Sequence, residues 1–192
     1  IILGCVAGLC KDKLPDAIIR VLSSIGISMP GYVIASALMM ILAVNCRILP
    51  VNYNKPGGWI MPMITLAIYP TSYLTRLTRA SILEVMNQDY LRTERAKGMS
   101  EFVVVFIHAL KNSLIPVITY LGPLTASILT GGFVAESVFS VPGLGRYFVS
   151  SISSRDYTMI MGVTIFYSSL IVIMNLVCDI LYKIVDPRIQ LD

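Results

Sequence analysis

The chain has 192 residues, of which 56% are hydrophobic and only 14% are charged. An average globular protein carries roughly 25% charged residues, so this chain has too little charge to cover a soluble domain. Its apolar content excludes intrinsic disorder, and its four scattered cysteines, without a Cys-x-x-Cys pair, argue against a secreted disulfide scaffold. The composition therefore predicts an integral membrane protein.

Four long stretches without Asp, Glu, Lys or Arg predict spanning helices, because about 20 apolar residues cross the hydrocarbon core of a bilayer. They are residues 21–46, 56–75, 112–135 and 157–178. Residues 1–10 are apolar but lack the basic start and cleavage site of a signal peptide, so we expect the end of a helix whose beginning is missing. The predicted fold is an all-α polytopic transmembrane bundle of about five helices, the first one partial.

The expected helix boundaries follow from turn-forming residues between the apolar runs. The four complete helices are expected at 21–46, about 60–83, about 113–136 and about 157–184. Pro30 and Gly31 interrupt the first of them, where a kink is expected. The segments 47–58 and 137–156 read as loops. Gly143 and Gly145 in the second loop lack the third glycine and the strand–helix context of a dinucleotide site, so we expect a structured turn that caps the membrane.

Orientation follows from Lys and Arg, which accumulate in cytoplasmic loops. Crossing the membrane at each long run places 11 of the 15 Lys and Arg on one side and 4 on the other. The richer side is the predicted cytoplasmic side, and it contains residues 76–111. This asymmetry explains the net charge of +4 without a nucleic-acid partner.

Residues 76–111 carry an unusual density of charges of both signs. Residues 80–98 predict one amphipathic helix, since they contain good helix formers, no internal Pro or Gly, and Gly98 where a left-handed residue would end it. Ser100 is the expected N-cap of a second helix that ends near Pro116. A solvated loop whose basic residues only fix the topology is the alternative. Mixed charges and the helix–Gly–helix order favour a docking hairpin.

Four motifs occur in order along nearly the whole chain. They are Arg76-Leu-Thr-Arg-Ala80; Asp89-Tyr90-Leu91-Arg92-Thr93-Glu94-Arg95-Ala96-Lys97-Gly98-Met99-Ser100-Glu101, which continues from His108 to Val117; Glu136-Ser-Val-Phe-Ser-Val-Pro-Gly-Leu-Gly-Arg146; and Asp186-Pro187-Arg188. Together they resemble the inner-membrane permeases of ABC importers of the dipeptide/oligopeptide/nickel class. When the sequences are aligned on Gly98, Arg92 and Thr93 are typical of the peptide class, whereas Glu94 departs from the usual pattern.

The resemblance implies a coupling helix that seats in a cleft of a cytoplasmic ATPase subunit. The residues that it implies for this helix are Asp89, Tyr90, Leu91, Arg92, Thr93, Glu94, Arg95, Ala96, Lys97 and Gly98. Arg92, Arg95 and Lys97 can make charge-assisted contacts with an acidic cleft. Tyr90 and Leu91 can supply apolar anchors.

The same resemblance implies a multi-pass permease subunit of the cell (inner or plasma) membrane that forms half of a pathway for di- and oligopeptides. Residues 1–192 would be one permease domain that lacks its N-terminal start, with residues 76–111 as its cytoplasmic coupling segment. The implied partners are a second permease subunit, two cytoplasmic ATPase subunits that bind ATP, an extracytoplasmic substrate-binding protein and membrane lipid. The chain itself has no Walker motif and is expected to be no enzyme and to hold no cofactor.

Two other functions stay open at this point. A permease of the same class could carry nickel or another small solute. A stand-alone secondary transporter or channel would require membrane-embedded charge pairs or inverted repeats, and the sequence shows neither. His108 has no second His or Cys at ligand spacing, so packing is favoured over metal binding. Glu136, near the external boundary, is expected to have a structural role at a helix end.

Overall fold

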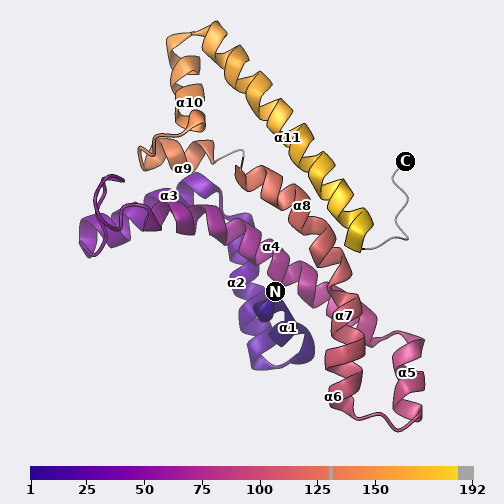
Figure 1. The fold of residues 1–192 in the computed structure, drawn as a ribbon. Coiled ribbons are helices and arrows are strands. Elements are labelled where there is room, and N and C mark those ends of the chain that lie inside the picture. The colour runs from indigo at the N-terminus through magenta and orange to yellow at the C-terminus, as the bar shows by residue number, and fades with distance from the viewer. Residues whose placement is uncertain (130–131, 186–192) are drawn as a thin grey trace. The chain divides into compact units, whose positions relative to one another are not determined.

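Helices form most of the computed structural model (Figure 1). The structure describes residues 1–129 and 132–185, and within these ranges no strand occurs, which confirms the all-α prediction. The motif Asp186-Pro187-Arg188 lies outside the described residues. By its packing the chain divides into two compact units, residues 1–28 with 70–121 and residues 29–69 with 122 onward.

The first unit begins with two helices joined by a short turn. Its elements are α1 (Ile2–Leu9), α2 (Leu14–Ser28), the second half of α4 (Ile60–Met86), α5 (Asp89–Ala96), α6 (Glu101–Val103), a π-helical stretch (Val104–Ala109), α7 (Leu110–Ser113) and the first half of α8 (Ile115–Leu129). Two glycines let α1 lie directly against α4. A Cβ atom on Gly4 would lie 2.5 Å from the Thr78 Cβ, and one on Gly8 would lie 2.8 Å from the Ile82 Cγ2. Glycines four residues apart allow such close backbone approach between membrane helices.

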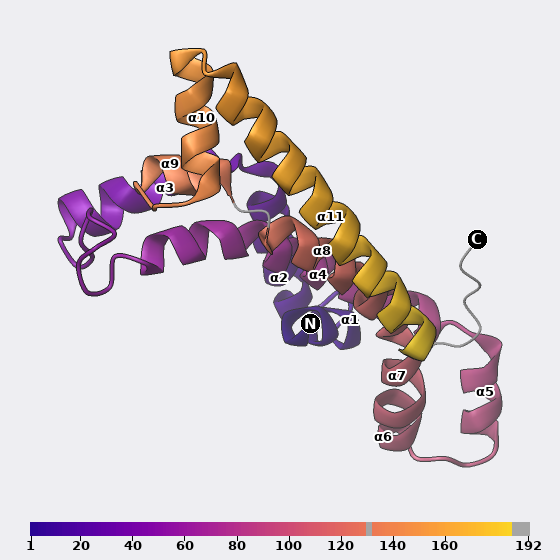
Figure 2. The ribbon, with the colours of Figure 1, turned by 45° about the horizontal axis from the view of Figure 1, so that its top comes forward.

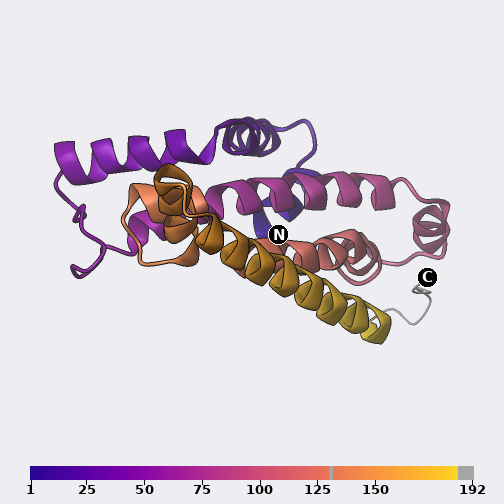
Figure 3. The same ribbon diagram turned by 90° about the horizontal axis from the view of Figure 1, so that it is seen from above.

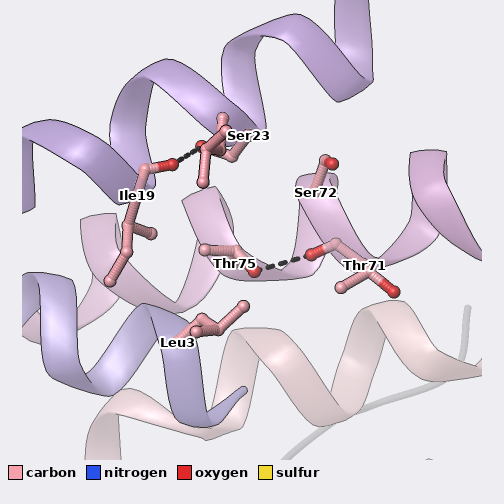
Figure 4. Close-up of a pocket in the computed structure, with 7 residues that line it drawn as sticks. Leu3, Ile19, Ser23, Thr71, Ser72 and Thr75 are labelled. Atoms are coloured by element: carbon pink, nitrogen blue, oxygen red, sulfur yellow. Dashed lines mark hydrogen bonds between the residues drawn. The ribbon is translucent and has the colours of Figure 1, made fainter.

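A cavity of about 130 Å³ remains between α1, α2 and α4 (Figure 4). Its lining residues are Leu3, Ile19, Leu22, Ser23, Thr71, Ser72 and Thr75. The Ser23 hydroxyl donates to the Ile19 carbonyl and the Thr75 hydroxyl to the Thr71 carbonyl, each one turn back in its own helix. These two hydroxyls are therefore satisfied within their helices and make no bond between helices.

The second unit contains the remaining helices around a small apolar core. Its elements are α3 (Gly31–Leu38), a π-helix (Met39–Asn45), the first half of α4, the end of α8, α9 (Phe133–Val138), α10 (Leu144–Ser154) and α11 (Tyr157–Val185). The buried core residues are Ala35, Ala43, Met61, Ala135 and Phe139. The last helix, α11, runs without interruption as Figure 3 shows in orange to yellow, close to the predicted 157–184.

The predicted single helix over residues 21–46 is wrong. Helix α2 begins earlier, at Leu14, and ends at Ser28, and α3 begins only at Gly31. Pro30 is extended, with φ −61° and ψ 140°. Proline also disfavours helical geometry in the residue before it, so the chain leaves the helix at Met29 and Pro30 instead of bending within it.

The predicted continuous helix over residues 80–98 is also wrong, because it breaks between α4 and α5. Gln88 is extended (φ −73°, ψ 144°), and the Asn87 side chain donates to the Leu83 carbonyl at 2.9 Å. Such local bonds from Asn compete with the helical backbone. Gly98 does adopt the expected left-handed conformation after α5, with φ 82°. Ser100 lies at the expected N-cap position before α6, but its side chain makes no cap hydrogen bond.

Two further boundaries differ from expectation. Helical structure does not stop near Pro116, because this residue lies in the first turn of α8, where a missing N–H is tolerated. The expected loop over 137–156 is mostly helical, since α10 covers Leu144–Ser154. Pro142 and Gly143 confine the irregular backbone to a short turn before α10.

Within the described part of the chain, two helical stretches are long and apolar enough to cross a membrane, Glu101–Thr125 and Tyr157–Val177. A third is present if α2 and the helices after its break count as one span. Helix α4 has 27 residues, but its prolines and hydroxyl side chains dilute its apolar content, and it does not belong to this set. The structure therefore has the helices of a multi-pass membrane protein.

Candidate functional site

Residues 89–113 form a hairpin in which α5 lies beside α6 and α7; we call it the α5 hairpin (Figures 1 and 2). Its apolar centre consists of Leu91, Val104 and Ala109, and Val85 and Met86 at the end of α4 pack against them. Leu91 is fully buried. Burial of a leucine side chain contributes roughly 1.5–3 kcal/mol. The amphipathic pattern of α5 thus serves to attach it to the rest of the hairpin.

A two-pronged ion pair closes the tip of the hairpin. The Arg95 guanidinium donates from Nε to Glu101 Oε2 at 3.1 Å and from Nη2 to Oε1 at 2.9 Å. These hydrogen bonds raise the pKa of Arg95 above its usual value. Gly98 lies between the two partners, and a Cβ there would meet nothing within 4 Å. The requirement for glycine therefore comes from its left-handed backbone and not from lack of space.

Two further polar contacts join α5 to the opposite arm of the hairpin, at positions further from its tip. The Glu94 Oε1 lies 3.3 Å from Nδ1 of His108, and the Asn112 side chain donates to the Tyr90 hydroxyl at 2.8 Å. The other Glu94 oxygen, Oε2, is buried and has no hydrogen-bond partner among the described residues. His108 looks isolated in the sequence, because its partner Glu94 lies on the other arm of the hairpin and no motif joins the two.

The opposite face of α5 points away from the hairpin. Asp89, Arg92, Thr93 and Ala96 are exposed, and their spacing of three, four and seven residues places them in one stripe on a helix. The Asp89 side chain is 95% exposed and that of Arg92 76%, and the two form an ion pair at 3.7 Å. We call these four residues the outward stripe.

Nine of the ten residues expected at this site fall into two groups, and the tenth, Gly98, forms the turn after α5. Tyr90, Leu91, Glu94 and Arg95 contact the other arm of the hairpin. The outward stripe and Lys97 are exposed. Leu91, expected as an anchor for a partner, has no exposed surface and instead holds the hairpin together.

The Glu136 motif forms a second organised corner, between α9 and α10. The Arg146 backbone N–H donates to Glu136 Oε2 at 3.2 Å, and Arg146 Nη1 donates to the Ser140 carbonyl at 3.3 Å. A Cβ on Gly143 would overlap the Glu136 carboxylate, and one on Gly145 would lie 2.6 Å from the Phe133 ring. The carboxylate therefore caps the start of α10, where the helix dipole favours negative charge. This is the structural role expected for Glu136.

Comparison with known proteins gives a family match over residues 1–191, to the family described as "Binding-protein-dependent transport system inner membrane component". The chain is 45% identical over 192 residues to the dipeptide transport system permease protein DppB of Bacillus subtilis (strain 168), covering 100% of this chain and 62% of that protein. It is 38% identical over 195 residues to the oligopeptide transport system permease protein OppB of Haemophilus influenzae, covering 97% and 62%.

The oligopeptide transport system permease protein AppB of Bacillus subtilis (strain 168) is 42% identical over 179 residues, covering 88% of this chain and 57% of that protein. The chain therefore spans about three fifths of the length of these relatives. The matches confirm the resemblance found in the motifs, the inner-membrane location and the assignment to transport permeases, not enzymes. The chain belongs to the family of binding-protein-dependent transport system inner membrane components.

Proposed function

We propose that this chain is part of the permease subunit of an ABC importer for di- or oligopeptides, and that the outward stripe of α5 is the surface on which its ATPase subunit docks. The names of the relatives, dipeptide and oligopeptide transport permeases, support the substrate class. The observation that carries the docking proposal is that α5 has two faces. One packs against the other arm of the hairpin, and the other is exposed and charged.

The outward stripe has the chemistry of a surface that exchanges partners. An exposed ion pair contributes about 0–1 kcal/mol, so the pair between Asp89 and Arg92 opens at little cost when a partner approaches. The freed Arg92 guanidinium can then make a two-pronged hydrogen bond with a carboxylate of the ATPase. Ala96 has a small side chain, which lets the partner come close to the helix backbone.

The remaining partners follow from the same proposal. They are a second permease subunit, two ATPase subunits that bind and hydrolyse ATP, and an extracytoplasmic substrate-binding protein. A hairpin held by an apolar centre and three polar contacts moves as one body, and such rigid-body movement can open one face of the membrane pathway while it closes the other. Transport of nickel or another small solute by the same arrangement is the second candidate.

The test is co-purification of the ATPase subunit with the full-length permease, co-expressed and extracted from membranes. Ala96→Trp fills the stripe and Arg92→Glu reverses its charge, so we expect each to lower the recovered ATPase at least about tenfold, a change that 1.4 kcal/mol of binding energy produces. Lys111→Glu is the matched control, because it reverses an exposed charge on the other arm of the hairpin. Equal recovery from all three variants would overturn the docking proposal.

A second measurement addresses the substrate. Proteoliposomes that contain the complete transporter should accumulate a radiolabelled dipeptide in an ATP-dependent manner. Accumulation of Ni²⁺ without accumulation of the peptide would replace the peptide proposal by the nickel alternative.

A further inference from the structure

A buried ion pair in the first unit, between Asp16 and Arg79, lies outside the α5 hairpin. Asp16, in the first turn of α2, is fully buried. It accepts hydrogen bonds from Arg79 of α4, from Nε at 2.6 Å and from Nη2 at 2.8 Å. The Asp12 backbone N–H donates to the same carboxylate at 3.0 Å. Arg20 is more distant, with its Nε 4.0 Å from Asp16.

This pair joins the corner between α1 and α2 to α4. Asp12 lies in that corner with a left-handed backbone, φ 60°, and its bond to Asp16 fixes the turn. The glycine contacts of α1 with Thr78 and Ile82 lie on the same part of α4 as Arg79. Helices α1 and α2 are thus attached to the stretch of α4 that leads directly into α5.

The chemistry of the pair makes it a firm link. The carboxylate has no exposed surface, so a loss of Arg79 would leave a buried charge without its main partner. The Arg79 guanidinium stays charged at every physiological pH, as arginine does in proteins. A planar guanidinium with two parallel bonds also fixes an orientation that a single bond would not.

Prolines lie near the places where the chain passes between the first unit and the second. The chain passes between the two units three times, after residues 28, 69 and 121. A proline follows each of these positions within two residues: Pro30, Pro70 and Pro123. Proline removes a helical hydrogen bond and permits kinks. Within the unit, the pair between Asp16 and Arg79 holds α2 to α4.

We infer that Arg79 and Asp16 are positioning residues that carry the movement of the α5 hairpin to α1 and α2, so that these helices move with it as one body. The inference rests on the proposed docking of an ATPase at α5. Without the pair, the ATPase would still dock on the hairpin, but its movement would reach α1 and α2 incompletely.

The experiment measures dipeptide transported per ATP hydrolysed by the complete transporter in proteoliposomes. For Arg79→Gln we expect the ATPase to co-purify as in the wild type, but transport per ATP to fall about tenfold, within the range of coupling between distant sites. The exchange Asp16→Arg with Arg79→Asp should recover at least half of the lost transport. Arg20→Gln, which removes the distant arginine, should change neither value.

Three outcomes decide between the proposals. Full transport per ATP in Arg79→Gln would overturn this inference and leave the docking proposal intact. Failure of the ATPase to co-purify with the wild type would instead contradict the docking proposal. If Arg79→Gln does not fold, Asp16→Asn removes the carboxylate charge from the pair, and its full transport per ATP would overturn the inference in the same way.

Discussion

The α5 hairpin and the corner between α9 and α10 both turn the chain between helices, but different contacts hold them. In the hairpin, side chains from two arms meet in an apolar centre and in three polar contacts. In the corner, one carboxylate, Glu136, fits against two glycines and caps the following helix. The hairpin therefore depends on contacts between side chains of its two arms. The corner depends on the Glu136 carboxylate and on two glycines whose lack of a side chain leaves room for it.

This difference fits what each region leaves exposed. The hairpin uses the inward side chains of α5 for its own stability, so the outward stripe with Asp89 and Arg92 is free for a partner. The corner uses its motif residues, Glu136 and the glycines, for its own geometry. The motif of residues 89–98 therefore contains a candidate contact surface, whereas the motif of residues 136–146 contains residues that the fold of the corner requires.

The largest expected effect tests the apolar centre of the hairpin. Leu91→Ala removes a fully buried side chain, and we expect a loss of about 3 kcal/mol in stability from lost burial and the resulting cavity. Thermal unfolding of the full-length permease in detergent, together with hydrogen exchange of the α5 amides, measures it. Met99→Ala is the control, since Met99 is 42% exposed in the turn of the same hairpin. A loss as small as that of the control would show that polar contacts alone hold α5.

The second effect tests the corner. Gly143→Ala would push the Glu136 carboxylate aside and so break its hydrogen bond with the Arg146 backbone N–H. We expect a loss of about 1–2 kcal/mol, the usual contribution of a helix cap. The same unfolding measurement applies. Gly162→Ala is the control, because Gly162 lies within helix α11 and has open space around it, so alanine should not destabilise the protein there. If the clash is the cause, adding Glu136→Ala should make the effect of Gly143→Ala smaller than in the wild type.

The sequence could predict features that depend on nearby residues better than features that depend on distant ones. The left-handed Gly98 and the N-cap position of Ser100 depend on neighbours within a few residues, so local patterns predicted them correctly. The structural role of Glu136 was expected from its position near a helix end, but its partner Arg146 lies ten residues further along the chain. The break at Gln88 gave no proline or glycine signal. The partner of Asp16 lies 63 residues away, and a single sequence shows no pattern that joins such distant side chains.

The smallest effect tests the polar contact between Glu94 and His108, which lie 3.3 Å apart. His108→Leu would leave both oxygens of a mostly buried carboxylate without a partner among the described residues, since Oε2 already has none. We expect a loss of about 1 kcal/mol, the usual contribution of one hydrogen bond, and a fall in Tm of roughly 2–4 °C. His108→Gln, which can still donate to Glu94, should lose less. Combining His108→Leu with Glu94→Gln should recover part of the loss, because the buried side chain is then neutral.

If His108→Leu unfolds at the wild-type temperature, the apolar centre and the Arg95 ion pair are sufficient to hold the hairpin. The contrast with the α9–α10 corner would then depend on those contacts alone.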